Sequence, residues 1–365
     1  MTPDARIAAA IDVLDACLSG SSAEHTLTNW ARRNRYAGSG DRAALRDLVF
    51  DAIRCKRSFA WRSNSQSGRG LMLGRAHAMG EDLDLAFSGQ GYGPPQPTEA
   101  ERVAIDIDTA PLPVRYDCPD WLWPELQRGL GDDLAAVLEI MQTRAPVFLR
   151  SNTARASREA AIASLAQDTI EARPHPLGPT VIEVTSNPRR VRNAAAYRDG
   201  MVEFQDAASQ AVTDLLAEAC PDGDILDYCA GGGGKALALA ARGRYRVVAH
   251  DADQNRMKDI PVRAERAGAK ITVTQAPQGR FDAVLCDVPC SGSGAWRRQP
   301  EAKWALTPER LAELNALQDS ILQQATAFVA PRGILAYATC SMLPSENVER
   351  IESFLKKNAN WRLKV

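Results

Sequence analysis

The stretch Asp224-Ile-Leu-Asp-Tyr-Cys-Ala-Gly-Gly-Gly-Gly-Lys235, followed by alternating alanine and leucine at 236–240, decides the fold. A short apolar strand runs directly into four glycines and then into a helix. Glycines at such a turn let backbone N–H groups approach a ligand at the helix N-terminus. Twenty residues beyond Gly231, Asp251 ends the next apolar segment, where a carboxylate can accept both hydroxyls of a ribose. The pattern predicts a site for a nucleoside-bearing cofactor, and the turn alone leaves a nicotinamide-dependent dehydrogenase open.

Short apolar segments and helical segments alternate throughout this part of the chain. The strand candidates are Ile225–Tyr228, Arg246–Ala249, Ile271–Val273, Ala283–Cys286 and Ile334–Ala338, and a helical pattern covers Leu311–Val329. Strands that alternate with helices are typical of a parallel, doubly wound sheet. We therefore expect an α/β protein with a Rossmann-like sheet. A Walker A loop is excluded because Lys235 is followed by Ala236.

Composition indicates a soluble protein of more than one domain. The chain has 365 residues, of which 45% are hydrophobic and 24% charged, and one hydrophobic core stops growing at roughly 250–300 residues. No apolar run approaches the ~20 residues that span a bilayer, and the start does not resemble a signal peptide; we expect a cytoplasmic monomer with no membrane contact. The eight cysteines include no C-x-x-C pair, which argues against a metal site and a disulfide framework.

The chain divides into three predicted parts. Residues 1–140 are expected to form a helical domain with a loop-rich connection, because Ile7, Ile11, Leu14 and Leu18 recur at helical spacing and the Gly, Ser and Pro content rises after Ser63. Residues 141–198 are expected to form a small mixed α/β subdomain around a β-α-β unit. Residues 199–365 are expected to form the catalytic domain.

Two cysteines follow strands at one predicted edge of the sheet. One strand runs into Asp287-Val-Pro-Cys290-Ser-Gly-Ser-Gly294, and the last strand delivers Thr339-Cys340-Ser341. Parallel strands present their carboxyl ends at the same edge, where such sheets bind ligands. Either cysteine alone would more often be a small buried hydrophobe, but both lie in loops rich in Gly, Ser and Pro. We expect both thiols to face one pocket.

Methylation of carbon 5 of cytosine requires such a pair. This carbon is too weakly nucleophilic to attack a sulfonium, so a thiolate must first add to carbon 6. An acid beside the ring can bond to nitrogen 3 and the exocyclic amine, and a base must then remove the proton from carbon 5 so that the thiolate can leave. Asp287 fits the first role and Cys290 the second.

These motifs resemble the Sun-type (RsmB-like) RNA cytosine-5 methyltransferases. The resemblance also rests on Phe204-Gln-Asp-Ala-Ala-Ser-Gln210, Arg297-Arg-Gln-Pro-Glu-Ala-Lys-Trp304 and Pro344-Ser-Glu-Asn347. It implies a class I methyltransferase fold that uses S-adenosyl-L-methionine, an RNA-binding (RRM-like) subdomain, and Cys340 as the nucleophile with Cys290 assisting release. The implied catalytic residues are Cys340, Cys290, Asp287 and Lys235. The implied cofactor contacts are Cys229, Ala230, Gly231, Gly232, Gly233, Gly234, Lys235, Asp251, Arg256, Gln275 and Asp287.

The N-terminal helices and several departures refine this resemblance. Residues 41–54 look like the NusB-like domain of the ribosomal-RNA members, which favours 16S rRNA over tRNA as substrate. The cofactor loop lacks the proline of the usual C-A-A-P-G-G-K, Gln275 stands where an acid usually contacts adenine, and the chain ends before the strand pair that normally closes the sheet. A catalytically idle RNA-binding assembly factor is therefore an alternative.

Two further interpretations concern the nucleophile and the basic residues. A DNA cytosine-5 methyltransferase would instead use the Pro-Cys cysteine, and the T-C-S motif at Cys340 argues against it. Arg297, Arg298 and Lys303 follow the catalytic loop and are candidates to clamp RNA phosphates, with a salt-bridged surface as the alternative. The four histidines show no ligand spacing.

Overall fold

The computed structural model describes residues 1–364, which form two compact units. The helical unit comprises Met1–Ala145 together with Ser291–Pro308 and Met342–Pro344. The sheet unit comprises Pro146–Cys290, Glu309–Ser341 and the residues from Ser345 onward. The segment that follows Cys290 in the chain therefore belongs to the helical unit.

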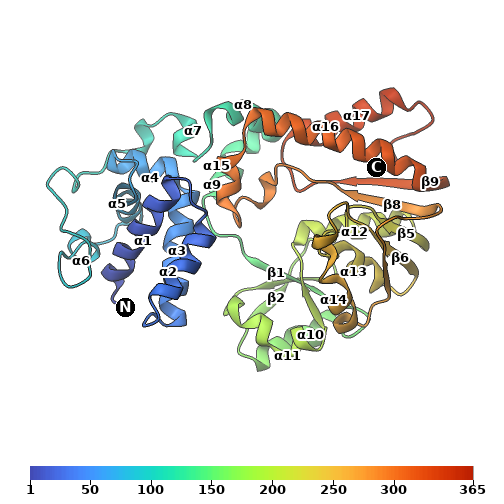
Figure 1. Ribbon diagram of the computed structural model, residues 1–365, viewed down its shortest axis with the longest axis horizontal. Helices are drawn as coiled ribbons and strands as arrows, with labels where there is room; N and C mark the ends of the chain where they lie inside the picture. The colour runs from blue at the N-terminus through green and yellow to red at the C-terminus, as the bar shows by residue number, and fades with distance from the viewer. Residues whose placement is uncertain (365) are drawn as a thin grey trace. The chain divides into compact units, whose positions relative to one another are not determined.

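Five helices build the core of the helical unit (Figure 1). They are α1 (Pro3–Leu18), α2 (Ala23–Arg33), α3 (Ser39–Arg54), α4 (Lys56–Ser63) and α5 (Gly68–Met79). Helical spacing puts Ala10, Val13 and Leu14 of α1 on one buried face. Shorter elements complete the unit: α6 (Leu83–Ala86), α7 (Leu112–Arg115), α8 (Trp123–Leu130), α9 (Leu134–Met141) and α15 (Pro300–Ala305).

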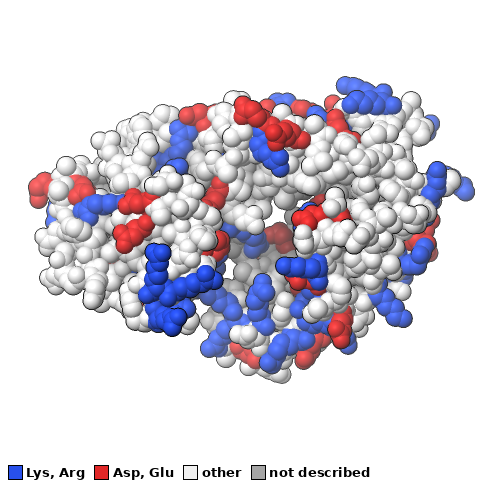
Figure 2. Space-filling view, viewed as in Figure 1, with Lys and Arg blue, Asp and Glu red and all other residues white. Residues whose placement is uncertain are grey.

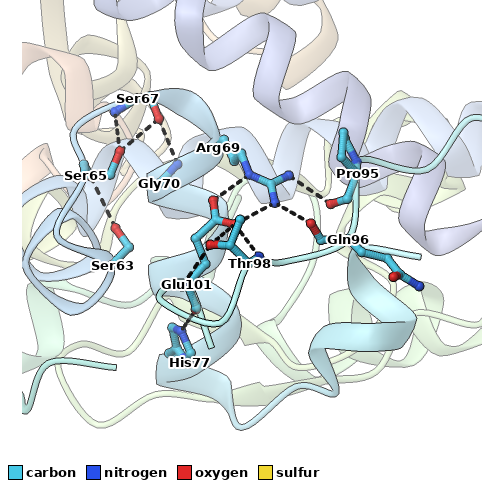
Figure 3. Close-up of polar contacts among 10 residues, drawn as sticks. All are labelled: Ser63, Ser65, Ser67, Arg69, Gly70, His77, Pro95, Gln96, Thr98 and Glu101. Atoms are coloured by element: carbon cyan, nitrogen blue, oxygen red, sulfur yellow. Dashed lines mark hydrogen bonds and ion pairs between the residues drawn. The ribbon is translucent and has the colours of Figure 1, made fainter. Parts of the chain in front are cut away.

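The region after Ser63 is better ordered than its Gly, Ser and Pro content predicts. Helix α5 lies within it and is buried along much of its length, and Gly74 lets its backbone approach the Phe59 carbonyl of α4. The loop that follows is pinned by Arg69, whose guanidinium bonds both carboxylate oxygens of Glu101 at 2.8 and 3.0 Å and the Pro95 carbonyl at 3.0 Å (Figure 3). The loop-rich connection expected from the sequence is present between α6 and residue 107, and these bonds hold it in place.

The small sheet of the sheet unit has the strand order β2-β3-β1-β4. Its strands are β1 (Val147–Ser151), β2 (Ala172–Pro174), β3 (Val181–Val184) and β4 (Val202–Phe204), with α10 (Arg158–Gln167) and α11 (Ala195–Arg198) packed against them. All three pairings are antiparallel, so β1 and β2 run parallel to one another on either side of β3. β4 pairs with β1, so the small sheet extends past the predicted boundary at residue 198.

The large sheet is parallel throughout, with the order β7-β6-β5-β8-β9. Its strands are β5 (Gly223–Asp227), β6 (Tyr245–Ala249), β7 (Ile271–Val273), β8 (Phe281–Asp287) and β9 (Val329–Ala338). Figure 1 shows α16 (Pro308–Ala325) and α17 (Val348–Lys357) on one side of these strands, and α12 (Ala207–Ala219), α13 (Gly234–Ala240) and α14 (Ile260–Ala267) on the other. The predicted doubly wound α/β fold is confirmed.

The register of this sheet brings the predicted site residues to one edge. Asp287 of β8 pairs with Ala338 of β9, so the segments that carry Cys290 and Cys340 leave neighbouring strands at the same end. Val329, predicted to be helical, begins β9 instead. No helix among residues 1–364 is long and apolar enough to cross a membrane.

Candidate active site

The glycine loop forms the predicted turn between β5 and α13. Gly231 and Gly233 have φ of 51° and 80°, which favours glycine at both positions. A Cβ at Gly231 would lie 2.9 Å from Nη2 of Arg256, and one at Gly233 would lie 2.8 Å from Ile260. The loop therefore has a backbone conformation that requires glycine at these two positions, and α13 begins directly after it at Gly234.

Asp251 is held at the end of β6 by backbone and side-chain donors. Its carboxylate accepts hydrogen bonds from the backbone N–H of Gly231 at 2.8 Å and of Asp253 at 2.9 Å, and from Arg256 at 3.0 Å. Two of the predicted cofactor residues, Asp251 and Arg256, are thus brought to the glycine loop. Each carboxylate oxygen can accept more than one bond, so the capacity to accept ribose hydroxyls remains.

The other predicted cofactor contacts lie at different depths. The Ala230 N–H donates to the His250 carbonyl at 2.8 Å, which fixes the start of the loop beside β6. Burial raises the pKa of the Cys229 thiol to about 12, so this side chain is a neutral part of the wall. Gln275 is exposed and donates to Gln254 at 2.7 Å, which leaves its amide oxygen for a ligand.

Asp227, at the end of β5, is a buried acid that the sequence analysis did not assign to the site. Burial, followed by the neighbouring Asp287, raises its pKa to about 7. Its two carboxylate oxygens have no hydrogen-bond partner of normal geometry among the described residues, although the Ala236 amide is close enough to lower the pKa. A buried acceptor of this kind, beside a glycine cradle, fits a ligand with cationic or hydroxyl donors. The signal in the sequence was an acid at the last position of the strand that enters the glycine loop.

Four predicted catalytic residues meet at the ends of β8 and β9. The sulfur atoms of Cys290 and Cys340 lie 3.5 Å apart, and the Lys235 ammonium lies 2.6 Å from the Asp287 carboxylate. The hydrogen bond with Cys290 is the main cause that lowers the pKa of Cys340 to about 7; burial and Asp287 act against it, and Lys235 supports it. Cys340 is exposed and Cys290 is half-buried. The arrangement supplies a reactive thiolate next to a second thiol and a paired acid.

The loop that carries Cys340 is held by side chains on both of its flanks. Thr339 donates its hydroxyl to Asn347 at 2.6 Å and accepts the Ser341 N–H at 3.1 Å, and Asn347 donates to the Ser341 carbonyl at 2.9 Å. These bonds close a ring around the nucleophile. Asn347 belongs to the Pro344–Asn347 motif, and its contact with Thr339 gives that motif a structural reason.

The loop that carries Cys290 is held by a buried amide on α16. Gln318 donates to the Pro289 carbonyl at 3.0 Å and to the Glu346 carboxylate at 3.0 Å, and both side chains are fully buried. Gln318 thereby links the residue before Cys290 to the motif after Cys340. Gln318 was not predicted as a site residue, because nothing distinguishes a single glutamine within an amphipathic helix.

Lys303 does not have the phosphate-clamping role considered from the sequence. It is only 7% exposed, its ammonium donates to the Arg54 carbonyl at 3.2 Å, and it lies 4.5 Å from the ring centroid of Trp304. Arg297 donates to backbone oxygens of Thr143 and Arg144 in the same helical unit. Both residues therefore anchor the 291–308 segment within that unit, whereas Arg298 is exposed.

Comparison with known proteins identifies the family. Residues 215–365 match the model of the 16S rRNA methyltransferase RsmB/F, and residues 118–191 match the ferredoxin-like domain of RsmF/B-like methyltransferases. The catalytic part of the chain is thus similar to the RsmB/F methyltransferase family. The resemblance inferred from the cysteine motifs is thus confirmed.

Curated relatives support the assignment to RsmB/F. The chain is 34% identical over 260 residues to ribosomal RNA small subunit methyltransferase B of Serratia proteamaculans, covering 68% of this chain and 60% of that protein. It is 33% identical over 276 residues to the Citrobacter koseri protein of the same name, covering 73% and 64%. The chain thus spans about three fifths of the length of these relatives.

Solved structures show the same fold. PH0851 has a TM-score of 0.71 at 22% identity, covering 98% of this chain and 90% of that chain. NSun6 from Pyrococcus horikoshii, solved with SFG, has a TM-score of 0.57 at 16% identity, covering 66% and 87%. The Rossmann-like class I methyltransferase fold expected from the sequence is therefore confirmed.

Proposed function

We propose that this chain methylates carbon 5 of a cytosine in small-subunit rRNA, with S-adenosyl-L-methionine as methyl donor. The observation that carries the proposal is the 3.5 Å contact between the sulfurs of Cys290 and Cys340, next to the Lys235–Asp287 pair. The names of the curated relatives support rRNA over tRNA as the substrate. A protein that modifies this RNA works where ribosomes assemble, which agrees with the expected cytoplasmic location.

The nucleophilic step belongs to Cys340. Its lowered pKa, about 7, leaves a large thiolate fraction at neutral pH, and the thiolate adds to carbon 6 of cytosine. Electron density moves to carbon 5, which then accepts the methyl group that bound S-adenosyl-L-methionine supplies. Asp287, fixed by the Lys235 ammonium, lies at the polar edge of the ring. One of its carboxylate oxygens accepts from the exocyclic amine, and the other passes a proton from the Lys235 ammonium to nitrogen 3 as negative charge builds there.

Release belongs to Cys290. After methyl transfer, carbon 5 carries both a proton and the new methyl group. Cys290, which has released its own thiol proton to solvent once Cys340 is bonded to carbon 6, takes the carbon 5 proton as a thiolate. The electron pair of the broken C–H bond re-forms the carbon 5–carbon 6 double bond, and the bond between Cys340 and carbon 6 breaks. Cys340 leaves as a thiolate, which the neighbouring Cys290 thiol stabilises.

The cofactor would be held by the residues around the glycine loop. The backbone of Gly231–Gly234 lies at the start of α13, where N–H groups favour polar and anionic ligand atoms. Asp251 is positioned to accept ribose hydroxyls, and the buried Asp227 carboxylate provides a further acceptor. Arg256 and Cys229 complete the wall, and Gln275 contributes a side-chain amide in place of an acid.

The target base must be unpaired or flipped out, because a stacked, paired cytosine offers no path for a thiolate to carbon 6. This requirement fits a substrate strand that is recognised in single-stranded form.

Trapping on 5-azacytidine-substituted small-subunit rRNA tests the proposal. Wild type, Cys340→Ala and Cys290→Ala are incubated with the RNA and S-adenosyl-L-methionine and analysed on denaturing gels, with Cys17→Ala in the helical unit as a matched control. A covalent adduct that only Cys340→Ala abolishes supports the mechanism. Loss with Cys290→Ala alone would move the nucleophile to the Pro-Cys loop, and no adduct from any protein, together with no cofactor binding, would favour the idle assembly factor.

A further inference from the structure

A pocket in the helical unit has the composition of a nucleotide site. Its volume is about 570 Å³, within the roughly 300–1,000 Å³ typical of small-molecule sites. Every residue that lines it belongs to the helical unit, so it is separate from the cysteine pair of the sheet unit. The lining residues that the argument uses are Lys56, Arg57, Trp61, Asn64, Gln66 and Trp304.

Two tryptophans from distant parts of the sequence line this pocket. The Trp61 indole N–H donates to the Asp106 carbonyl at 3.3 Å, and the Trp304 indole N–H donates to the Ile53 carbonyl at 2.7 Å. Each ring is therefore fixed at its polar edge, and both are half-buried. Both indoles line the pocket, and nucleic-acid bases stack on aromatic side chains without regard to sequence.

The polar side chains of the pocket differ in whether they already have hydrogen-bond or ion-pair partners among the described residues. Arg57 is committed, because its guanidinium bonds Asp120 in two places. Lys56 is available: its ammonium lies 5.6 Å from the Trp304 ring centroid and forms no ion pair within residues 1–364. The side-chain amides of Asn64 and Gln66 likewise have no hydrogen-bond partner in the described part of the chain. Amides bond to base edges, and a lysine ammonium binds phosphate.

We propose that this pocket binds one unpaired nucleotide of the substrate RNA. The base stacks on the Trp61 indole, and the amides of Asn64 and Gln66 contact its edge. Lys56, which lies over the Trp304 ring, binds an adjacent phosphate. The proposal rests on the proposed function only in taking RNA as the substrate. It gives the helical unit a direct part in RNA recognition.

Equilibrium binding of a short single-stranded oligoribonucleotide to the full chain tests the pocket. Loss of one stacked base weakens binding by about 5- to 150-fold, so Trp61→Ala should show a loss in this range and Trp61→Phe should restore most of the affinity. Lys56→Met should lower the slope of log affinity against log salt by about 0.7, the value for one phosphate contact on a single strand. A purely structural role of Lys56 would not change this slope.

Matched controls lie on exposed parts of the same unit. Arg42→Met removes one positive charge from α3, and Tyr92→Ala removes an aromatic ring that is 90% exposed; both should bind RNA as wild type does. Thermal unfolding of every variant shows whether an affinity loss comes from misfolding. If Trp61→Ala does not fold, the double variant Gln66→Ala/Lys56→Met is tested in its place.

The outcomes separate this proposal from the proposed function. Wild-type affinity in folded Trp61→Ala, or an unchanged salt slope in Lys56→Met, overturns the pocket even if the cysteine adduct forms. A nucleoside monophosphate that binds as tightly as the oligonucleotide also overturns it, since the site would then serve free nucleotides. Conversely, the expected losses in a chain that forms no adduct keep the pocket as an RNA site while the methyltransferase proposal fails.

Discussion

Replacing Cys290 with alanine should change the acidity of Cys340, and the size of the change can be worked out from the structure. The hydrogen bond between the two sulfurs, which lie 3.5 Å apart, is the largest cause of the lowered pKa of Cys340, about 7 against an ordinary 9.0. Without that bond, burial and the Asp287 charge remain and both raise the pKa. We therefore expect the pKa of Cys340 in Cys290→Ala to return to its ordinary value or above it.

The expected effect on reactivity at pH 7 is smaller than the change in ionisation. A thiol with a pKa of 7 is about half ionised at pH 7, and one with a pKa of 9 is about 1% ionised, a roughly 50-fold difference in thiolate. The more basic thiolate is about 6- to 10-fold more nucleophilic, because nucleophilicity rises with pKa with a Brønsted coefficient of about 0.4–0.5. The net loss of alkylation rate at pH 7 is therefore about 5- to 8-fold.

Alkylation of Cys340 by iodoacetamide, followed by peptide mass spectrometry between pH 5 and pH 10, measures the pKa directly. Wild type should show a midpoint near 7, and Cys290→Ser, which keeps a hydrogen-bond donor, should lie closer to wild type than Cys290→Ala does. A midpoint near 7 in Cys290→Ala would refute the reasoning and would assign the low pKa to Lys235 instead.

Three further predictions concern buried groups. Asp227→Asn should raise the unfolding temperature at pH 8 and weaken the binding of S-adenosyl-L-methionine, as measured by calorimetry. The folded-state pKa of Asp227 is raised to about 7 from 3.8, so the free energy of unfolding falls as pH rises through this range, by at most about 4 kcal/mol. Asparagine removes that pH dependence. Gly74→Ala should destabilise the helical unit by about 3 kcal/mol in urea unfolding, because the new Cβ would lie 1.9 Å from the Phe59 carbonyl oxygen, whereas Gly40→Ala in α3 meets no atom within 4 Å and should stabilise by about 0.5–1 kcal/mol. Lys303→Met should destabilise the protein by about 3 kcal/mol, because it leaves buried Asp117 without its cation. The exposed control Arg298→Met should change the free energy of unfolding by less than about 0.5 kcal/mol. Equal effects of Gly74→Ala and Gly40→Ala, or of Lys303→Met and Arg298→Met, would contradict the packing argument.

The parallel sheet and its site were predictable because their signals are local. Strand, glycine turn and helix follow one another within residues 224–240, and the rule that parallel strands end at one edge places Cys290 near Cys340 without further information. The 3.5 Å contact of their sulfurs agrees with that inference. Asp227 was readable in the same way, since an acid at a strand end before a glycine loop faces the ligand.

The structural elements that escaped prediction depend on distant partners. β4 has three residues, too few to show alternation, and it exists because Val202–Phe204 pairs with β1 about fifty residues earlier. Gln318 has no distinguishing neighbour in the sequence, and its role appears only when the Pro289 carbonyl and Glu346 are brought to it. Lys303 was considered for phosphate contact because lysine is almost never buried unless it has a partner, so an exposed side chain was expected. Its partners, Arg54 and Asp117, lie in the predicted helical domain of residues 1–140, far from Lys303 in the sequence.

The position of Lys303 and Trp304 changes how the helical unit should be understood. Cys290 ends one stretch of the sheet unit, and the residues that directly follow it, 291–308, belong to the helical unit. There, Arg54 donates to the Arg297 carbonyl at 3.0 Å, and Lys303 and Trp304 donate to the carbonyls of Arg54 and Ile53 at the end of α3. A chain lacking residues 1–140 would expose a lysine and an indole that are now satisfied by α3, in the segment adjacent to the Pro-Cys loop. The N-terminal helices are therefore part of what fixes the loop after Cys290, and not an appendage that can be removed without consequence for the catalytic part.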